Sequence, residues 1–140
     1  MRANRSIPPV TVIPVLAYAD LPAAVAWLCD TFGFTERLRI GDHRVQLTVG
    51  DGAVVATQRD VDPSGAAQDH SIMVRIPDVR AHAAHASTRG ARITQPPTDH
   101  LYGERQYSVV DIGGHAWTFS ESIDDVDPAS WGGVLVDGAR

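Results

Sequence analysis

Apolar and polar positions follow two different periods along this chain, and the changes between them predict strands and helices. The apolar, β-branched run Val10–Tyr18 is typical of a buried strand, and Pro14 within it favours an edge position or a bulge. Asp20 is a typical helix N-cap, and apolar residues recur at helical spacing over Ala23–Phe32. Gly33 then ends the predicted helix.

Three short strands are predicted to complete the first half of the chain. They are separated by turn sequences that contain Gly and Asp, and they span Thr35–Ile40, Arg44–Val49 and Ala53–Gln58. A polar stretch that contains Pro and Gly, residues 61–69, is typical of a linker. The first half is therefore predicted to have the order β-α-β-β-β.

The same order of elements begins again in the second half. We predict a strand at His70–Ile76, a helix at Val79–Arg89, a strand at Ala91–Thr94, a long loop at Gln95–Gly103, and strands at Glu104–Val110 and His115–Ser120. Three pairs of equivalent positions lie 57 to 62 residues apart, namely Asp20 with Asp78, Gly33 with Gly90, and Gly52 with Gly114. This near-constant offset indicates an internal repeat.

The repeat divides the chain into five segments. We expect an N-terminal extension (1–9), a first βαβββ module (10–60), a linker (61–69), a second module (70–122) and a C-terminal tail (123–140). The tail is expected to be irregular, with Trp131 as its only large anchor.

Composition and charge exclude several classes of function. The net charge is −5, which argues against nucleic acid as the main partner, because phosphate binding needs clustered Lys and Arg. Cys29 is the only cysteine, so no intramolecular disulfide can form. No run approaches the roughly 20 apolar residues of a membrane span, and the first residues do not resemble a signal peptide. We therefore expect a cytoplasmic protein with no membrane partner.

Three segments resemble the vicinal-oxygen-chelate superfamily, which includes glyoxalase I, extradiol dioxygenases and bleomycin-resistance proteins. AYADLPAAVAWLCDTFGFTE (17–36) looks like the first family helix, and residues 70–93 resemble its second copy. YGERQYSVVDIGGHAWTFSES (102–122) resembles the closing hairpin, with Ile112 where the family usually has Pro. The resemblance implies an α+β fold of two βαβββ modules, whose curved mixed sheets enclose a cavity with the helices outside.

The resemblance also implies where a metal would bind. Metal-dependent members place one ligand seven residues before each helix-cap Asp and another four residues after each turn Gly. In this chain those positions are Ile13, Ala56, Ser71 and Thr118. Ile and Ala carry no donor atom, and hydroxyl groups alone are weak ligands, so we expect no metal and no cofactor. The alternative, a divalent metal held by His70, His115 and Glu121, requires a large register shift.

Strand alternation assigns the residues that face the cavity, although a register slip of one residue reverses the faces. The residues predicted to contact a ligand are Val15, Gln46, Thr48, Ala56, Gln58, Ser71, Met73, Arg75, Tyr102, Arg105 and Thr118. No Asp or Glu belongs to this set, so Arg75 needs an anionic ligand, an internal acid or access to water. Arg105 offers a planar fork for a carboxylate or phosphate, but pairing with a surface acid is favoured. No catalytic residue is assigned.

Two functions follow from these positions. The first is a metal-free protein, resembling the bleomycin-resistance branch, that sequesters a small planar or anionic compound, with a homodimer as the expected assembly. The second is a metal-dependent lyase, isomerase or dioxygenase of the same superfamily. The donor set at the expected metal positions favours the first.

Overall fold

The computed structural model describes residues 2–65 and 70–135. The first module contains β1 (Val15–Tyr18), α1 (Leu21–Phe32), β2 (Thr35–Ile40), β3 (Arg44–Val49) and β4 (Gly52–Gln58). The second contains β5 (Ile72–Arg75), α2 (Val79–Thr88), β6 (Arg92–Asp99), β7 (Glu104–Val110) and β8 (Ala116–Ser122). Short 3₁₀ helices lie at Pro63–Gly65 and Pro128–Trp131. The prediction of an α+β fold with two βαβββ modules is confirmed.

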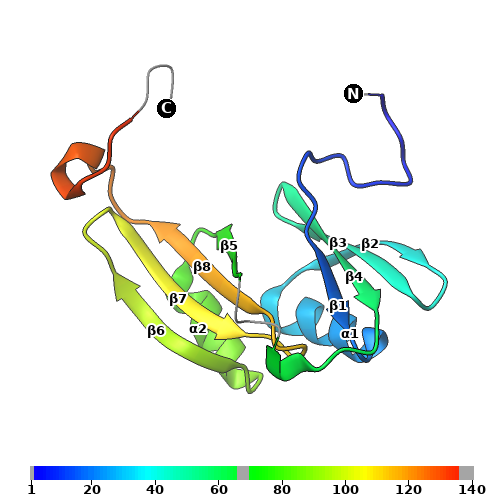
Figure 1. Ribbon diagram of the computed structural model, residues 1–140. Helices are drawn as coiled ribbons and strands as arrows, with labels where there is room; N and C mark the ends of the chain where they lie inside the picture. Colours follow the sequence, from blue (N-terminus) through cyan, green and yellow to red (C-terminus); the bar gives the residue numbers. More distant parts are fainter. Residues whose placement is uncertain (1, 66–69, 136–140) are drawn as a thin grey trace.

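Each module forms one mixed four-stranded sheet. The strand orders are β1-β4-β3-β2 and β5-β8-β7-β6, and β1–β4 and β5–β8 are the parallel pairs. Figure 1 shows the two sheets splayed apart, with α1 and α2 near their junction. The sheets do not close into a barrel, and the faces that carry no helix are open at Val15 and Met73, which are 50% and 61% exposed.

The sequence signals for the helix ends act as predicted. The Asp20 carboxylate accepts a hydrogen bond from the backbone N of Ala23 at 3.1 Å, and Asp78 does the same for Ala81 at 3.0 Å. These bonds satisfy N–H groups that have no partner within a helix. Gly33 follows α1 with a φ of +77°, a conformation that favours glycine.

Two predicted boundaries differ from the structure by five residues, and the others by at most two. β1 begins at Val15 rather than Val10, because Pro14 has no N–H to donate to a strand ladder. β6 continues to Asp99, so the first part of the predicted loop Gln95–Gly103 is a strand. Its two prolines are tolerated because β6 lies at the edge of its sheet, where some N–H groups need no partner. Part of the predicted linker (66–69) and the end of the tail (136–140) lie outside the described residues.

A single hydrophobic core lies behind both sheets. The ring of Phe32 at the end of α1 lies 5.6 Å from Trp117 and 5.0 Å from Phe119 of β8, measured between ring centroids. On α2, the two ring nitrogens of His82 contact the Tyr107 hydroxyl and the backbone oxygen of Phe32. The modules therefore pack through their helix-covered faces. In the described ranges, no helix is long and apolar enough to cross a membrane.

Candidate binding site on the inner sheet faces

We define the inner face of each sheet as the face opposite its helix. Paired residues on neighbouring strands share a face, so buried Leu16 and Leu47 mark the helix side of the first sheet, and Trp117 marks it in the second. The inner residues of the first sheet are Val15, Ala17, Arg44, Gln46, Thr48, Ala53, Val55 and Thr57. Those of the second, on β5, β7 and β8, are Met73, Arg75, Glu104, Gln106, Ser108, Val110, Ala116, Thr118, Ser120 and Ser122. Arg92 of β6 pairs with Val110 and shares this face.

Most of the residues predicted to face inward do so. Six of them lie on inner faces, namely Val15, Gln46, Thr48, Met73, Arg75 and Thr118. Ser71 is exposed directly before β5, and the Tyr102 hydroxyl reaches the inner face by donating to Gln106 Oε1 at 3.2 Å.

The predicted faces of Ala56 and Gln58 are wrong. Ala56 pairs with Leu16 and belongs to the core, where it is 1% exposed. Gln58 also lies on the helix side, where its Oε1 accepts from the backbone N of Leu21 at 2.9 Å, at the start of α1. Val55 rather than Ala56 is the inner residue paired with Val15. The equivalent inner position therefore lies three residues after the turn Gly52 in the first module and four residues after the turn Gly114 in the second.

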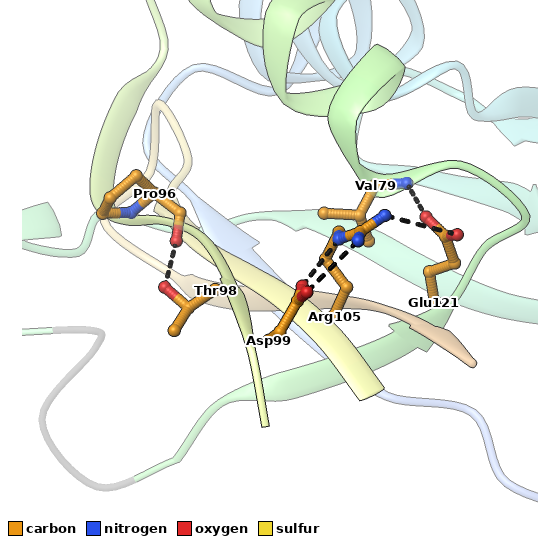
Figure 2. Close-up of polar contacts among 6 residues, drawn as sticks. All are labelled: Val79, Pro96, Thr98, Asp99, Arg105 and Glu121. Carbon is orange, nitrogen blue, oxygen red and sulfur yellow. Dashed lines mark hydrogen bonds and ion pairs between the residues drawn. The ribbon is translucent and has the colours of Figure 1, made fainter. Parts of the chain in front are cut away.

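Arg105 is a second correction, because it points to the helix side of the second sheet. Figure 2 shows its guanidinium between Asp99 and Glu121. Nε and one terminal nitrogen donate to the Asp99 carboxylate at 2.7 and 3.2 Å, and the other terminal nitrogen lies 3.9 Å from Glu121. The hydrogen bond from Arg105 lowers the pKa of Asp99. Glu121 also accepts from the backbone N of Val79 at 2.8 Å, so Arg105 helps to hold β6, β8 and the start of α2 together.

A row of polar side chains lies on the inner face of the second sheet, and its members on β7 are not among the residues predicted to face inward. Its members are Glu104, Gln106, Ser108, Ser120 and Ser122. The expectation that no acidic residue faces inward is therefore wrong. The signal was present in the alternation of β7, since apolar Tyr107 and Val109 point to the core and their neighbours must point inward.

Hydrogen bonds connect this row. Ser120 Oγ donates to Glu104 Oε1 at 2.7 Å and accepts from Gln106 Nε2 at 3.0 Å. Farther along the same face, the hydroxyls of Ser108 and Thr118 are bonded at 2.9 Å. The row therefore presents hydroxyl, amide and carboxylate groups to a ligand, and hydrogen bonds within the protein already fix the positions of these groups.

Arg75 stands at the open end of this face. Its side chain is exposed, and a terminal nitrogen donates to Ser122 Oγ at 3.1 Å. Within residues 2–65 and 70–135, no carboxylate forms an ion pair with Arg75. Arg75 and Met73 line a cavity of about 360 Å³ at the seam between the modules, together with Val12 and Pro14 before β1 and residues 49–54, which include the acidic Asp51.

The residues at the family's metal positions do not fit a divalent ion. With Val55 in place of Ala56, the four inner positions are Ile13, Val55, Ser71 and Thr118. Two of these side chains have no donor atom, and the Thr118 hydroxyl is already bonded to Ser108. A divalent ion needs several converging lone pairs from imidazole, thiolate or carboxylate groups, and two hydroxyls do not supply them.

The alternative ligands are not brought together either. His115 is buried, with Nε2 2.8 Å from the backbone oxygen of Ala17, whereas the carboxylate of Glu121 on β8 accepts from the backbone N of Val79 at the start of α2. His70 is exposed, and its ring centroid is 6.3 Å from that of His115. In the part of the chain that the structure describes, no three His, Cys, Asp or Glu side chains form a group that could hold a metal ion.

A buried polar cluster on the helix side joins the two modules. The Asp111 carboxylate accepts from the Tyr18 hydroxyl at 2.7 Å and from Trp117 Nε1 at 2.9 Å. It also accepts from the backbone N of Gly113 and of His115, each at 2.9 Å. Burial and the neighbouring carboxylate raise the pKa of Tyr18 far above its usual value. Because these groups satisfy one another away from the inner faces, we assign them to the junction and not to a ligand.

Comparisons with known proteins agree with this fold. The protein TioX from Micromonospora sp. ML1 is 32% identical, with a TM-score of 0.69 over 81% of this chain and 98% of that chain. The fosfomycin resistance protein FosX from Listeria monocytogenes, solved with Mn(II) and sulfate, is 16% identical, with a TM-score of 0.67 over 83% and 91% of the two chains. No curated protein sequence matches significantly. The family model for the Glyoxalase/Bleomycin resistance protein/Dioxygenase superfamily matches residues 8–119, and the chain therefore belongs to that superfamily.

Proposed function

We propose that this protein binds a small planar or anionic compound without a metal, against the inner face of its second sheet. The observation that carries the proposal is Arg75, an exposed guanidinium with no carboxylate partner among the described residues, beside apolar Met73. Binding sites for small molecules are typically apolar surfaces with a few placed polar groups. The seam cavity of about 360 Å³ falls within the size range of such sites.

The charges on this face orient the ligand. Arg75 presents a planar fork that suits a carboxylate, sulfonate or phosphate group. Glu104 lies in the polar row across β8 from Arg75, and its negative charge disfavours an anionic group there. The ligand's anionic group is therefore placed at Arg75, with its apolar body on Met73 and its neutral polar groups along the row.

Exposed apolar residues on the two inner faces also favour a homodimer. Val15 and Met73 are apolar residues that are 50% and 61% exposed in a single chain. A two-fold partner that faces them covers this surface and completes a cavity, as the family resemblance implies. Sedimentation equilibrium tests this part of the proposal, and a monomer at micromolar concentration refutes it.

Metal analysis tests the absence of a metal. The full chain is purified without chelators and without a metal-binding tag, and its metal content is measured by mass spectrometry. We expect less than stoichiometric metal. Stoichiometric Fe, Zn, Ni or Mn refutes the proposal and favours a metal-dependent lyase, isomerase or dioxygenase.

Replacement of Arg75 tests the binding mode. A thermal-shift screen of planar organic anions first identifies a compound that stabilises the protein. Arg75→Met should then weaken binding of that compound by about tenfold or more, because a charge-assisted hydrogen bond is lost. Arg80→Met removes an exposed arginine from α2, on the opposite side of the sheet, and serves as the matched control. Equal affinities in the two variants remove Arg75 from the site.

A further inference from the structure

The N-terminal segment, residues 2–11, lies over the inner face of the first sheet. Gln46 Nε2 on that face donates to the backbone oxygen of Ser6 at 2.9 Å. Arg37 donates from one terminal nitrogen to Gln46 Oε1 at 2.5 Å and from the other to the backbone oxygen of Arg5 at 3.2 Å. Pro8 is buried, and Gln46 is only 4% exposed. Side-chain bonds therefore fix the segment on the sheet, without strand pairing.

A cavity of about 610 Å³ is lined by this segment together with Ile13 and, from the sheet, Arg37 of β2. Its uncharged lining is largely apolar and consists of Ala3, Asn4, Ile7, Pro8, Pro9, Val10, Thr11 and Ile13. Its charged lining consists of three arginines, Arg2, Arg5 and Arg37, and no acidic residue lines it. The volume is typical of a site for a small organic molecule.

The three arginines have no negative counterpart. None of them forms an ion pair with a carboxylate among the residues that the structure describes. This local excess of positive charge contrasts with the net charge of −5 for the whole chain. Positive groups that line one cavity repel one another, and a bound anion relieves that repulsion.

We propose that this cavity is a second binding site, for a small organic anion with an apolar or aromatic body. The half-buried Arg37 presents a guanidinium that is already oriented by Gln46 and the Arg5 backbone. Arg2 and Arg5 have exposed side chains that close over the anionic group from the segment. The site is formed by the N-terminal segment and Arg37 of the first sheet, so it does not depend on the proposed function of the second sheet.

Titration of the ¹⁵N-labelled full chain with 1-naphthoate, followed by NMR, tests the proposal. Saturable shifts are expected at amides of residues 2–13 and at the side chains of Arg37 and Gln46. The neutral isostere 1-naphthamide should bind about tenfold more weakly, because it has no charge to pair with the arginines. Shifts confined to Met73 and Arg75 instead place the anion on the second sheet, which overturns this proposal and leaves the proposed function standing.

Arginine variants test whether binding depends on the positive charges of the N-terminal segment. Arg2→Gln combined with Arg5→Gln changes only exposed side chains and should weaken 1-naphthoate binding about fivefold or more. Arg80→Gln changes an exposed arginine on α2 and should leave the affinity unchanged. The proposal is overturned if naphthoate does not saturate at millimolar concentration, or if the double variant binds as tightly as Arg80→Gln.

Discussion

Replacing Tyr18 with Phe removes a single oxygen atom from the junction of the two modules. Tyr18 is 1% exposed, and its hydroxyl donates to Asp111 Oδ2 at 2.7 Å. Phe keeps the shape of the ring, so the variant leaves the packing of the core in place and deletes one hydrogen bond to a charged group. Such a bond contributes about 1.5–3 kcal/mol to stability.

The remaining donors set an upper limit to the effect. Asp111 keeps Trp117 Nε1 on the same oxygen at 2.9 Å, and two backbone N–H groups on the other oxygen. The buried carboxylate therefore stays partnered in the variant, and the cost of about 3–5 kcal/mol for an unpaired buried charge does not arise. We expect Tyr18→Phe to lower the free energy of unfolding by about 1.5–3 kcal/mol.

Urea unfolding at neutral pH measures this loss as a lower midpoint with an unchanged slope. Tyr102→Phe is the matched control, because it deletes the same atom from a residue that is 37% exposed, where the hydroxyl donates to Gln106 at 3.2 Å. The control should change stability by less than about 0.5 kcal/mol. Equal losses in the two variants refute the conclusion that the Asp111 cluster holds the modules together.

Two further predictions concern the same junction. Burial lowers the pKa of His82 below its usual 6.5, so folding favours the neutral ring. Stability linked to His82 is present above pH 6.5 and is lost as the pH falls through the lower folded pKa. The urea midpoint should therefore depend less on pH in His82→Gln than in the unchanged protein. An equal pH dependence contradicts its assignment to His82. Gly114 has a φ of +85°, and a Cβ there would lie 1.7 Å from the backbone oxygen of Pro63, whereas Gly90 has a φ of +76° and open space. Calorimetry should thus find Gly114→Ala less stable than Gly90→Ala by about 1 kcal/mol or more, and equal melting temperatures exclude the close contact.

The sequence predicted the fold well because its signals for element ends are local. An Asp side chain caps a helix by accepting a hydrogen bond from its first turn, and a Gly in the left-handed region ends the helix. Both effects depend only on residues nearby in the sequence. Inner faces were also predictable wherever alternation was counted from a helix cap, as for Val15 and Met73. The face of Ala56 failed because it was counted from the turn Gly52, and a slip of one residue reverses a strand's faces.

The partners of Arg105 and Gln46 were beyond local reasoning. Arg105 meets Asp99 only because β6 continues through two prolines at a sheet edge. Gln46 was predicted to face inward and does, but the N-terminal segment buries it through a bond between residues 40 positions apart in the sequence. Alternation gives the direction of a side chain along its strand, and it carries no information about which distant segment covers that face.

The division between the two sides of the sheets explains how this fold accommodates different ligands. Residues that stabilise the chain, such as Tyr18, Trp117 and Asp111, lie on the helix side and are at most 5% exposed. Inner residues such as Met73 and Thr118 are more exposed and contribute less to the core. Substitutions of such exposed inner residues should therefore cost little stability, whereas the buried inner residues Gln46 and Val55, each 4% exposed, contribute to the core. The two inner faces of this chain accordingly differ, because the second is open and polar whereas residues 2–11 cover part of the first.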